Sequence, residues 1–217
     1  MNHLVITGGA GGLAKAITAA FDDPNWGIAH PDRHTLDVTQ RQSVSTFFES
    51  RNVDLLICAA GLTHDAPILR MTEDSWDQVM EVNFFGAKTC AEAALPKMME
   101  RGEGHIIFIS SYSALHPPIG QAAYATAKAA LLGLTKDLAR RHGANRIRVN
   151  AILPGFLDTQ MTATVSTKRQ HEILTDHVLG QFNTPKAVAE FIRYLHERLL
   201  YTSGQQFQLD SRVPLDS

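Results

Sequence analysis

The sequence predicts an α/β fold in which a parallel sheet lies between two layers of helices. Two observations carry this prediction: short apolar runs alternate with longer amphipathic stretches along nearly the whole chain, and a glycine cluster follows the first apolar run. Alternating strands and helices are typical of repeated βαβ units, whose parallel strands are covered on both faces. We therefore expect a three-layer, doubly wound sheet of about seven strands with helices on both faces.

The first half of the chain begins with a unit of strand, glycine loop and helix. Residues 4–7 are apolar, four glycines follow among residues 8–12, and a helix over 13–21 ends before Pro24. Two short strands, 27–29 and 35–36, are separated by too few residues for a crossover helix, so one helix of a complete βαβ series is missing. A helix over 41–51 then leads into 53–58, an apolar run typical of a central strand.

The second half supplies two long helices, a last helix and three strands. Thr72 suits an N-cap and begins a helical pattern that runs to Met99. An Ala- and Leu-rich helix over 121–142 ends at Gly143. Thr184-Pro185 combines an N-cap with a proline at the first helical position and starts the last helix. The strands of this half are expected at residues 106–109, 147–153 and 206–209.

The composition fits a single domain over residues 1–217. Hydrophobic residues make up 44% and charged residues 19% of the 217 residues, which is enough apolar material for a buried core. The formal net charge is −2 and the basic residues are scattered, so we expect a small-molecule partner, and neither nucleic acid nor a membrane. No apolar run reaches the ~18 residues of a membrane span and no leader is recognisable, which predicts a cytoplasmic protein.

The glycine cluster predicts a dinucleotide site. Gly8 with either Gly11 or Gly12 fits two known glycine spacings, and Ala14 stands at the last glycine position of both. Glycine after a strand lets the backbone approach a pyrophosphate, and the helix N-terminus that follows supplies free N–H groups and positive potential. Alanine is tolerated at the last position because its task is close helix packing. A plain glycine-rich turn is the alternative interpretation.

Four side chains form a candidate catalytic group. Tyr124 and Lys128 are four residues apart on one helix, so both side chains emerge on the same face. Ser111 follows the strand at 106–109 and precedes Tyr124 by thirteen residues, and Asn83 lies in the long helix before it. The alternative is that all four are ordinary helix and strand-end residues.

These residues resemble the motifs of the short-chain dehydrogenase/reductase family, and the resemblance spans essentially the whole chain. It includes Thr7-Gly8, the four candidate catalytic residues and the turn at Pro154-Gly155. Asp37-Val38, Thr159 and Ser203-Gly204-Gln205 are similar to further marks of the family. The resemblance implies a Rossmann fold, NAD(P)H as cofactor, and hydride transfer between the cofactor and a carbonyl or secondary alcohol.

The resemblance also implies roles for the candidate residues. Tyr124 is expected to be the general acid of carbonyl reduction, or the base of alcohol oxidation, with its pKa lowered by the ammonium of Lys128. Ser111 would donate a hydrogen bond to the substrate oxygen, and Asn83 would hold a water that links Lys128 to solvent. The residues expected to contact the cofactor are Thr7, Gly8, Gly11, Gly12, Leu13, Asp32, Arg33, Asp37, Val38, Ala59, Ala60, Gly61, Tyr124, Lys128, Pro154, Gly155 and Thr159. Of these, Thr159 is expected at the nicotinamide carboxamide.

Two departures from the family pattern bear on the cofactor and the central strand. In the shortened segment after the second strand, Asp32 would favour NAD and Arg33 would favour NADP, so both cofactors stay open. The family usually has Asn before Ala-Gly, whereas this chain reads Cys58-Ala59-Ala60-Gly61. We expect Cys58 to be a buried, unreactive thiol, with no disulfide and no metal site in the protein.

The substrate is expected to bind at a loop over residues 159–183. Leu174, Val178 and Leu179 share one helical face there, which predicts a lid helix packed on the sheet. Residues 154–161 look similar to 3-oxoacyl carrier-protein reductases, which makes a ketoreductase the leading hypothesis. The alternatives are an extended-branch sugar reductase or epimerase, and a non-catalytic NAD(P)-sensing regulator. The family resemblance further implies a homodimer or homotetramer formed through the two long helices.

Overall fold

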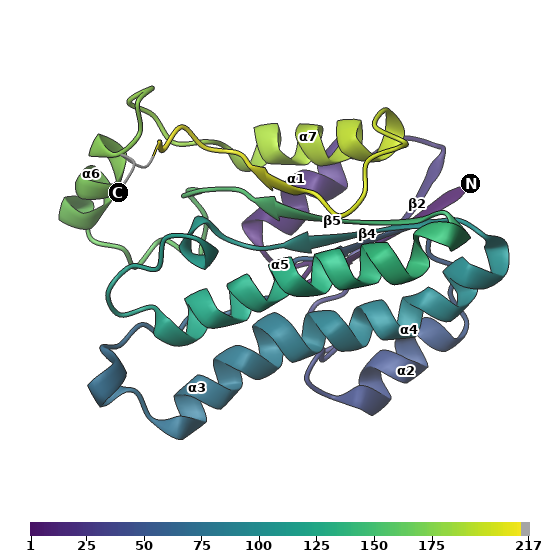
Figure 1. Cartoon of the computed structure of the whole chain (residues 1–217), viewed down its shortest axis with the longest axis horizontal. Coiled ribbons are helices and arrows are strands. Elements are labelled where there is room, and N and C mark those ends of the chain that lie inside the picture. The colour runs from purple at the N-terminus through teal and green to yellow at the C-terminus, as the bar shows by residue number, and fades with distance from the viewer. Residues whose placement is uncertain (214–217) are drawn as a thin grey trace.

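The computed structural model describes residues 1–213 and confirms a parallel sheet between two layers of helices (Figure 1). Its strands are β1 (Asn2–Thr7), β2 (Trp26–Ala29), β3 (Leu55–Cys58), β4 (Gly104–Ile109), β5 (Ile147–Leu153) and β6 (Gln206–Gln208). They lie in the order β2-β1-β3-β4-β5-β6, and every pair of neighbours is parallel. The sheet is doubly wound because the chain leaves β1 on one side for β2 and returns on the other side for β3.

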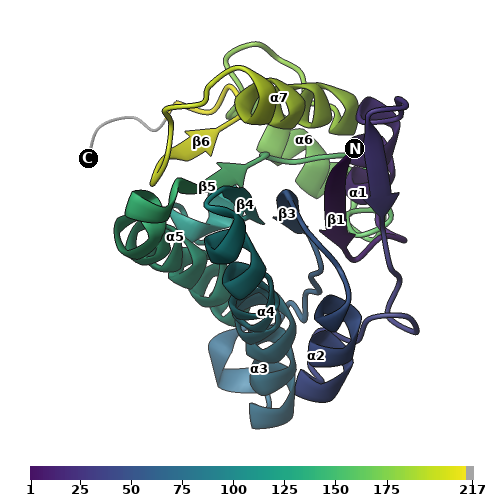
Figure 2. The ribbon, with the colours of Figure 1, turned by 90° about the vertical axis from the view of Figure 1, so that its right-hand side faces the viewer.

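The helices cover the two faces of the sheet (Figure 2). They are α1 (Gly12–Ala20), α2 (Arg41–Glu49), α3 (Glu73–Met80), α4 (Gly86–Arg101), α5 (Ala122–His142), α6 (Thr167–Thr175) and α7 (Pro185–Glu197). Side chains alternate along each strand, so that in β1 Leu4 and Ile6 pack toward α1 and α7, while Val5 packs toward α2 and α4. The same alternation in β3 and in residues 106–109 of β4 fills both cores and explains why these residues read as apolar runs.

Among residues 1–213 the sheet has six strands, and the prediction of a further strand at residues 35–36 is wrong. The amides of Thr35 and Leu36 both donate back to the carbonyl of Asp32, at 3.2 and 2.9 Å. The Asp32 carboxylate also accepts from the Thr35 amide and hydroxyl, at 2.9 Å each, which closes a turn. Leu36 is buried in the core beside α2 and α4, so its apolar character serves packing and not strand pairing. β2 is therefore one edge strand of the sheet, and β6 is the other.

The long helix expected from Thr72 to Met99 is present but contains one wide turn. Thr72 Oγ1 accepts from the Ser75 amide at 3.2 Å, which confirms the N-cap. Between α3 and α4 the chain forms a single π-helical turn, η2 (Glu81–Phe85). Such turns are often found at functional sites. Here the turn carries Asn83, whose side chain is fully buried.

The segment at residues 159–183 does not form the expected lid helix. α6 buries none of its residues, and Val178 and Leu179, predicted to lie on the packed face, are 69% and 70% exposed. The helix ends at Thr175, and the chain beyond it pairs with the C-terminal segment through a bridge between His177 and Arg212. The buried residue at this point is His177.

Among residues 1–213, we find no helix that is both long and apolar enough to cross a membrane.

Candidate active site

The candidate site lies at the carboxyl ends of the strands, where β1 and β3 diverge and the glycine loop begins. Gly8 has φ = 72°, and a Cβ atom there would lie 2.8 Å from Cα of Ala60. A Cβ atom at Gly9 would lie 1.9 Å from the carbonyl oxygen of His30, and the Gly9 amide donates to the Pro31 carbonyl at 2.9 Å. The loop is thus pressed between the ends of β2 and β3, and only glycine fits at both positions.

The start of α1 fits a pyrophosphate group. Within the described part of the chain, no backbone carbonyl accepts from the amides of Gly12, Leu13 and Ala14, and the first bonded amide of this turn is Lys15, which donates to Gly11 at 3.0 Å. The residue before the helix, Gly11, has no side chain to cap these amides. Free amides and the positive end of a helix dipole bind anions, so the glycine loop matches the phosphates of a dinucleotide.

Two other predicted cofactor residues adjoin this loop. Thr159 packs directly on it, since a Cβ atom at Gly12 would lie 3.1 Å from Cγ2 of Thr159. Thr7 is buried, and its hydroxyl accepts from the amides of Ala59 and Ala60 at 3.1 Å each. The Thr7 hydroxyl therefore ties β1 to the end of β3 from inside the protein.

The segment after β2 brings Asp32, Arg33 and Asp37 together at the surface. Hydrogen bonding by Thr35 holds the pKa of the Asp32 carboxyl below its usual value. The Arg33 side chain is 78% exposed and lies 3.5 Å from the Asp37 carboxylate. Val38 is buried against Gly86, where a Cβ atom would lie 2.6 Å from Cγ2 of Val38, so it anchors this segment on α4.

Asn83 and Lys128 face the same point beside Gly61. The Asn83 amide group donates to the carbonyls of Leu62 and Val79, at 2.8 and 2.9 Å, while its Oδ1 is buried and has no partner among residues 1–213. A Cβ atom at Gly61 would lie 2.8 Å from this Oδ1 and 3.5 Å from Nζ of Lys128. An unpaired buried oxygen beside an ammonium is a position suited to a bound water.

Lys128 is buried under the site. Its Nζ donates to the carbonyl of Ile109 at 2.9 Å, and burial lowers its pKa to about 8. The ammonium lies 5.6 Å from the centroid of the Tyr124 ring. The helical spacing thus brings the two side chains together as predicted.

Tyr124 and Ser111 complete the group of four candidate catalytic side chains. Burial raises the pKa of Tyr124 to about 12, and the Ser111 side chain opposes part of this rise. The sequence predicts that Lys128 lowers this pKa, whereas in the structure burial of the phenol is the largest influence and raises it. The Ser111 hydroxyl accepts from the Ser113 amide at 3.1 Å and caps a short 3₁₀ turn, η3 (Tyr112–Ala114).

The sequence interpretation missed two residues. Gly9 stood inside the glycine cluster, but the spacing patterns gave it no role. Asp210 supports the turn at Pro154-Gly155: Gly155 has φ = 80°, and a Cβ atom there would lie 2.6 Å from Cβ of Asp210. No local pattern could have indicated a contact between residues so far apart in the chain.

Comparisons with known proteins give the family. The family model described as enoyl-(acyl carrier protein) reductase matches residues 12–211. A 3-oxoacyl-[acyl-carrier-protein] reductase of Thermotoga maritima is 31% identical, over 95% of each chain. The crystal structure of a 3-oxoacyl-[acyl-carrier protein] reductase from Brucella melitensis superposes with a TM-score of 0.92 at 25% identity, covering 99% of this chain and 92% of that one.

The chain belongs to the short-chain dehydrogenase/reductase family. A putative gluconate 5-dehydrogenase from Beutenbergia cavernae, solved with bound NADP, has the same fold, with a TM-score of 0.91 at 24% identity over 97% of this chain and 95% of that chain. This short-chain dehydrogenase/reductase is an NAD(P)-dependent oxidoreductase that transfers a hydride between the cofactor and a carbonyl or alcohol carbon.

The cysteines of this short-chain dehydrogenase/reductase lie in the core. Cys58 and Cys90 are free and buried, and burial raises the pKa of the Cys90 thiol to about 12 and that of Cys58 well above its usual value. Neither thiol is a nucleophile at neutral pH. Cys58 Sγ lies 3.6 Å from the carbonyl of Ala87, so it joins β3 to α4.

Proposed function

We propose that the protein reduces 3-oxoacyl thioesters to 3-hydroxyacyl thioesters with NAD(P)H. The observation that carries the proposal is the placement of the proton-handling groups: Lys128 Nζ lies 5.6 Å from the centroid of the Tyr124 ring, and the unpaired Asn83 Oδ1 adjoins Gly61 beside the same ammonium. Carbonyl reduction needs a proton donor at that place, whereas alcohol oxidation needs a phenolate. The substrate class is supported by the 3-oxoacyl reductases among the relatives, which align over nearly the whole chain.

The catalytic roles follow from the positions of the four side chains. NAD(P)H, when bound, supplies the hydride that reduces the carbonyl carbon. Ser111 donates a hydrogen bond to the carbonyl oxygen, and Tyr124 gives its phenolic proton to that oxygen, which yields the alcohol. The ammonium of Lys128 stabilises the phenolate left on Tyr124. Asn83 Oδ1, free and buried beside Lys128, holds the water through which the proton is restored from solvent.

The cofactor is held by the glycine loop and the residues around it. The free amides at the start of α1 bind the pyrophosphate, and Gly8 and Gly9 let it approach the backbone. Asp32 and Arg33 would contact the adenine ribose, and Thr159 with the turn at Pro154-Gly155 would hold the nicotinamide. The loop over 159–183 carries the substrate contacts, and residues 1–217 act as one NAD(P)-binding domain.

The test measures binding and turnover separately, with NADH and with NADPH. Nicotinamide fluorescence reports binding, and loss of its absorbance with an acetoacetyl thioester reports reduction. We expect Tyr124→Phe to bind the cofactor as the wild type does but to lose at least ~100-fold in turnover. Tyr201→Phe is the matched control, because Tyr201 is 102% exposed.

The other outcomes separate the remaining functions. Reduction of a crotonyl thioester but not of the acetoacetyl thioester would indicate an enoyl reductase, in line with the description of the matching family model. Cofactor binding without turnover of any thioester or sugar substrate would favour an NAD(P)-sensing regulator. Failure to bind either cofactor would refute the interpretation of the glycine loop.

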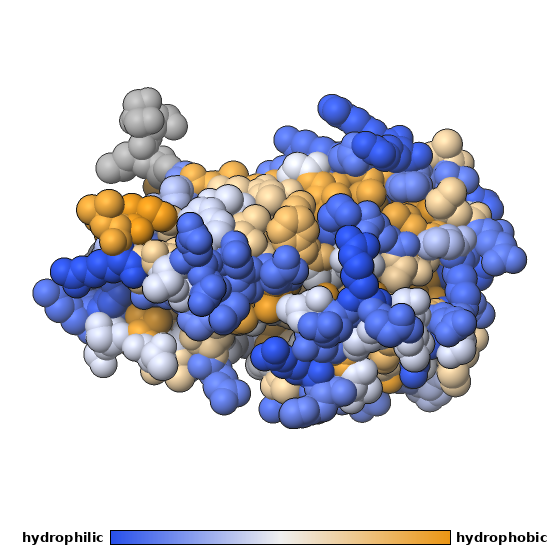
Figure 3. Space-filling model, turned by 90° about the horizontal axis from the view of Figure 1, so that it is seen from below, coloured by the Kyte–Doolittle hydropathy of each residue, from blue (hydrophilic) through white to orange (hydrophobic). Residues whose placement is uncertain are grey.

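We also propose that the protein is a homodimer or homotetramer that associates through α4 and α5. Phe85 and Met99, at the two ends of α4, are 44% and 41% exposed, and nothing lies within 4 Å of a Cβ atom built at Gly133 on α5. Seen from below, hydrophobic side chains form a band through the upper part of the molecule, above a mostly hydrophilic lower part (Figure 3). Elution as a monomer in sizing chromatography would refute the proposal.

We further propose a cytoplasmic location, supported by the two free cysteines, which suit a reducing compartment. Recovery of the protein outside the cytosolic fraction on cell fractionation would contradict it.

A further inference from the structure

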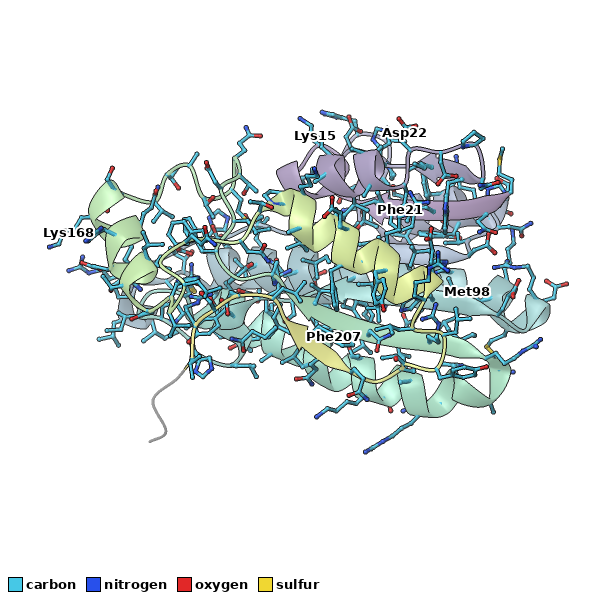
Figure 4. All side chains as sticks on the ribbon, turned by 90° about the horizontal axis from the view of Figure 1, so that it is seen from above. Lys15, Phe21, Asp22, Met98, Lys168 and Phe207 are labelled. Carbon is cyan, nitrogen blue, oxygen red and sulfur yellow. The ribbon has the colours of Figure 1, made fainter. Side chains whose placement is uncertain are left out.

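The segment that follows β6 lies against the turn that carries Ser111. In Figure 4 the chain continues from β6, where Phe207 is labelled, toward the end of the molecule that holds α6 and Lys168. There it pairs with the segment after α6: the Val178 amide donates to the Ser211 carbonyl at 3.1 Å, next to the bridge between His177 and Arg212. The last described residues therefore lie between two loops of the site.

Arg212 is held in one orientation by a buried carboxylate. Its Nε donates to Asp210 Oδ2 at 2.7 Å, and its Nη2 lies 2.5 Å from the same oxygen. The Asp210 side chain is fully buried and that of Arg212 is 11% exposed. Asp210 Oδ1 in turn accepts from Gln208 at 2.8 Å, so the carboxylate is fixed from both sides. Two nitrogens of the planar guanidinium converge on this one carboxylate oxygen, which limits the rotation of the guanidinium as well as its position.

The fixed guanidinium stacks on the residue next to Ser111. Cζ of Arg212 lies 3.4 Å from the centroid of the Tyr112 ring, and the same ring also stacks with His116 at 4.5 Å between ring centroids. Tyr112 is the first residue of η3, the turn capped by the Ser111 hydroxyl. The stack thus holds one side of the catalytic turn.

The other side of the same turn is held by a second chain of hydrogen bonds. Ser113 Oγ donates to Gln121 Oε1 at 3.0 Å, and Gln121 Nε2 donates to Asp65 Oδ2 at 2.9 Å. These contacts lead to α5 and to the loop after β3, which are parts of the scaffold. The contact to Arg212 leads instead to a segment at the end of the described chain.

We propose that Arg212 is a positioning residue for the reduction: its stack on Tyr112, fixed by Asp210, holds the Ser111 hydroxyl at the substrate oxygen. The inference rests on the proposed function. Loss of the stack would let η3 move and would weaken the hydrogen bond from Ser111 in the transition state, since misplaced donors lose most of their stabilisation. The pyrophosphate contacts come from the glycine loop, which Arg212 does not touch, and would be unaffected.

The kinetic test compares Arg212→Gln with Arg198→Gln. Arg198 is the control because it is exposed and its side chain makes no hydrogen bond to the rest of residues 1–213. We expect Arg212→Gln to lower kcat about tenfold, with the KM for cofactor within about twofold, and to raise the primary isotope effect with deuterated cofactor as the chemical step slows. In a Ser111→Ala background the same change should lower kcat by less than about twofold, because Arg212 acts through Ser111.

Three results would overturn the proposal. One is an equal loss of kcat in both backgrounds, which would mean that Arg212 acts independently of Ser111. Another is full activity of Arg212→Lys, because lysine keeps the charge but has no planar group to stack. The third is full activity of Tyr112→Leu, which removes the ring and leaves Arg212 and Asp210 in place.

A measurement without substrate separates this proposal from the proposed function. Hydrogen exchange of the amides at residues 111–116 should become about fivefold faster in Arg212→Gln and stay unchanged in Arg198→Gln, while exchange in α5 is equal in both. Unchanged exchange at 111–116 would refute the positioning role of Arg212 even if the wild type is an active reductase. If the wild type reduces no carbonyl compound but exchange rises as expected, the result supports the contact by which Arg212 holds η3 and refutes the proposed reaction.

Discussion

Lys128 should lower the stability of the protein at neutral pH, so that Lys128→Met yields a more stable but inactive protein. Burial lowers the pKa of Lys128 to about 8, from 10.5. Below pH 8 the side chain is charged in both the folded and unfolded states, and the shift corresponds to a cost of about 3 kcal/mol. Methionine avoids this cost but loses the hydrogen bond to the Ile109 carbonyl, which contributes about 1 kcal/mol. We expect a net gain of about 2 kcal/mol at pH 7.

The gain should disappear as the pH rises. Between the folded and unfolded pKa values, the unfolded chain still binds a proton that the folded protein has released, so the wild type becomes relatively more stable with increasing pH. By pH 10 the cost of the buried lysine falls to about 1 kcal/mol, which the hydrogen bond offsets. Wild type and Lys128→Met should then have nearly equal free energies of unfolding.

The difference between the two proteins is the quantity to measure, because other buried groups act in the opposite direction. Burial raises the pKa values of Cys58, Cys90 and Tyr124 in the folded protein. As the pH rises above about 9, these groups lose their protons in the unfolded chain before they do so in the folded protein, and the free energy of unfolding falls. They are present in both proteins. Their effect therefore cancels in the difference, apart from the charge interaction between Cys58 and Lys128.

The assay is urea unfolding followed by circular dichroism at pH 7 and pH 10, at equal protein concentration. Lys136→Met is the matched control, since Lys136 is exposed on the same helix and its replacement should change stability by less than about 0.5 kcal/mol. A less stable Lys128→Met protein at pH 7, or a difference that does not change with pH, would refute the reasoning.

The remaining predictions concern the pH profile, the glycine loop and a buried histidine pair. The rate of carbonyl reduction should fall about tenfold per pH unit above pH 8, as Lys128 loses the proton that stabilises the phenolate, and the pH dependence of kcat checks this. Gly9→Ala should abolish cofactor binding, because its Cβ atom would lie 1.9 Å from the His30 carbonyl oxygen. Gly133→Ala should bind the cofactor normally and raise the free energy of unfolding by about 0.5–1 kcal/mol. Cofactor titration and thermal melting distinguish the two variants. Burial, with a smaller effect of Arg148, lowers the pKa of His196 from 6.5 to about 4 beside His105, so the unfolded chain alone takes up this proton as the pH falls from 6.5 to 4. The stability lost over that range should be about 3 kcal/mol smaller in His196→Phe, and an unchanged acid slope in denaturant titrations would contradict this.

Local patterns were sufficient for the elements that face the core. β3 is buried on both faces and reads as an apolar run. Thr72 and Thr184 cap α3 and α7 with the side-chain bonds that their positions predict. The tyrosine and lysine of the site are brought together by helical spacing alone. These features depend on residues within one or two turns of each other.

One error arose from a local side-chain bond that competes with strand pairing, and the other from a contact between distant segments. Leu36 belongs to a turn because the Asp32 carboxylate captures the Thr35 amide and hydroxyl, and this competes with strand pairing. The helix at 167–175 stops early because the chain beyond it pairs with residues 211–212. A local sequence pattern does not indicate that the chain after residue 175 will pair with residues 211–212.

The π-helical turn at Glu81–Phe85 constrains how the length of this chain can change in evolution. Such a turn holds one residue more than the α-helix around it. Because the wider turn takes up this residue, the helices on its two sides keep the relative rotation that an uninterrupted α-helix would give them. Removing one residue at 81–85 would restore a regular helix and leave Cys90, Ala91 and Met98, which are fully buried, facing the core. Removing one residue elsewhere in α4 would instead rotate the residues beyond it by about 100° and take their buried side chains out of the core.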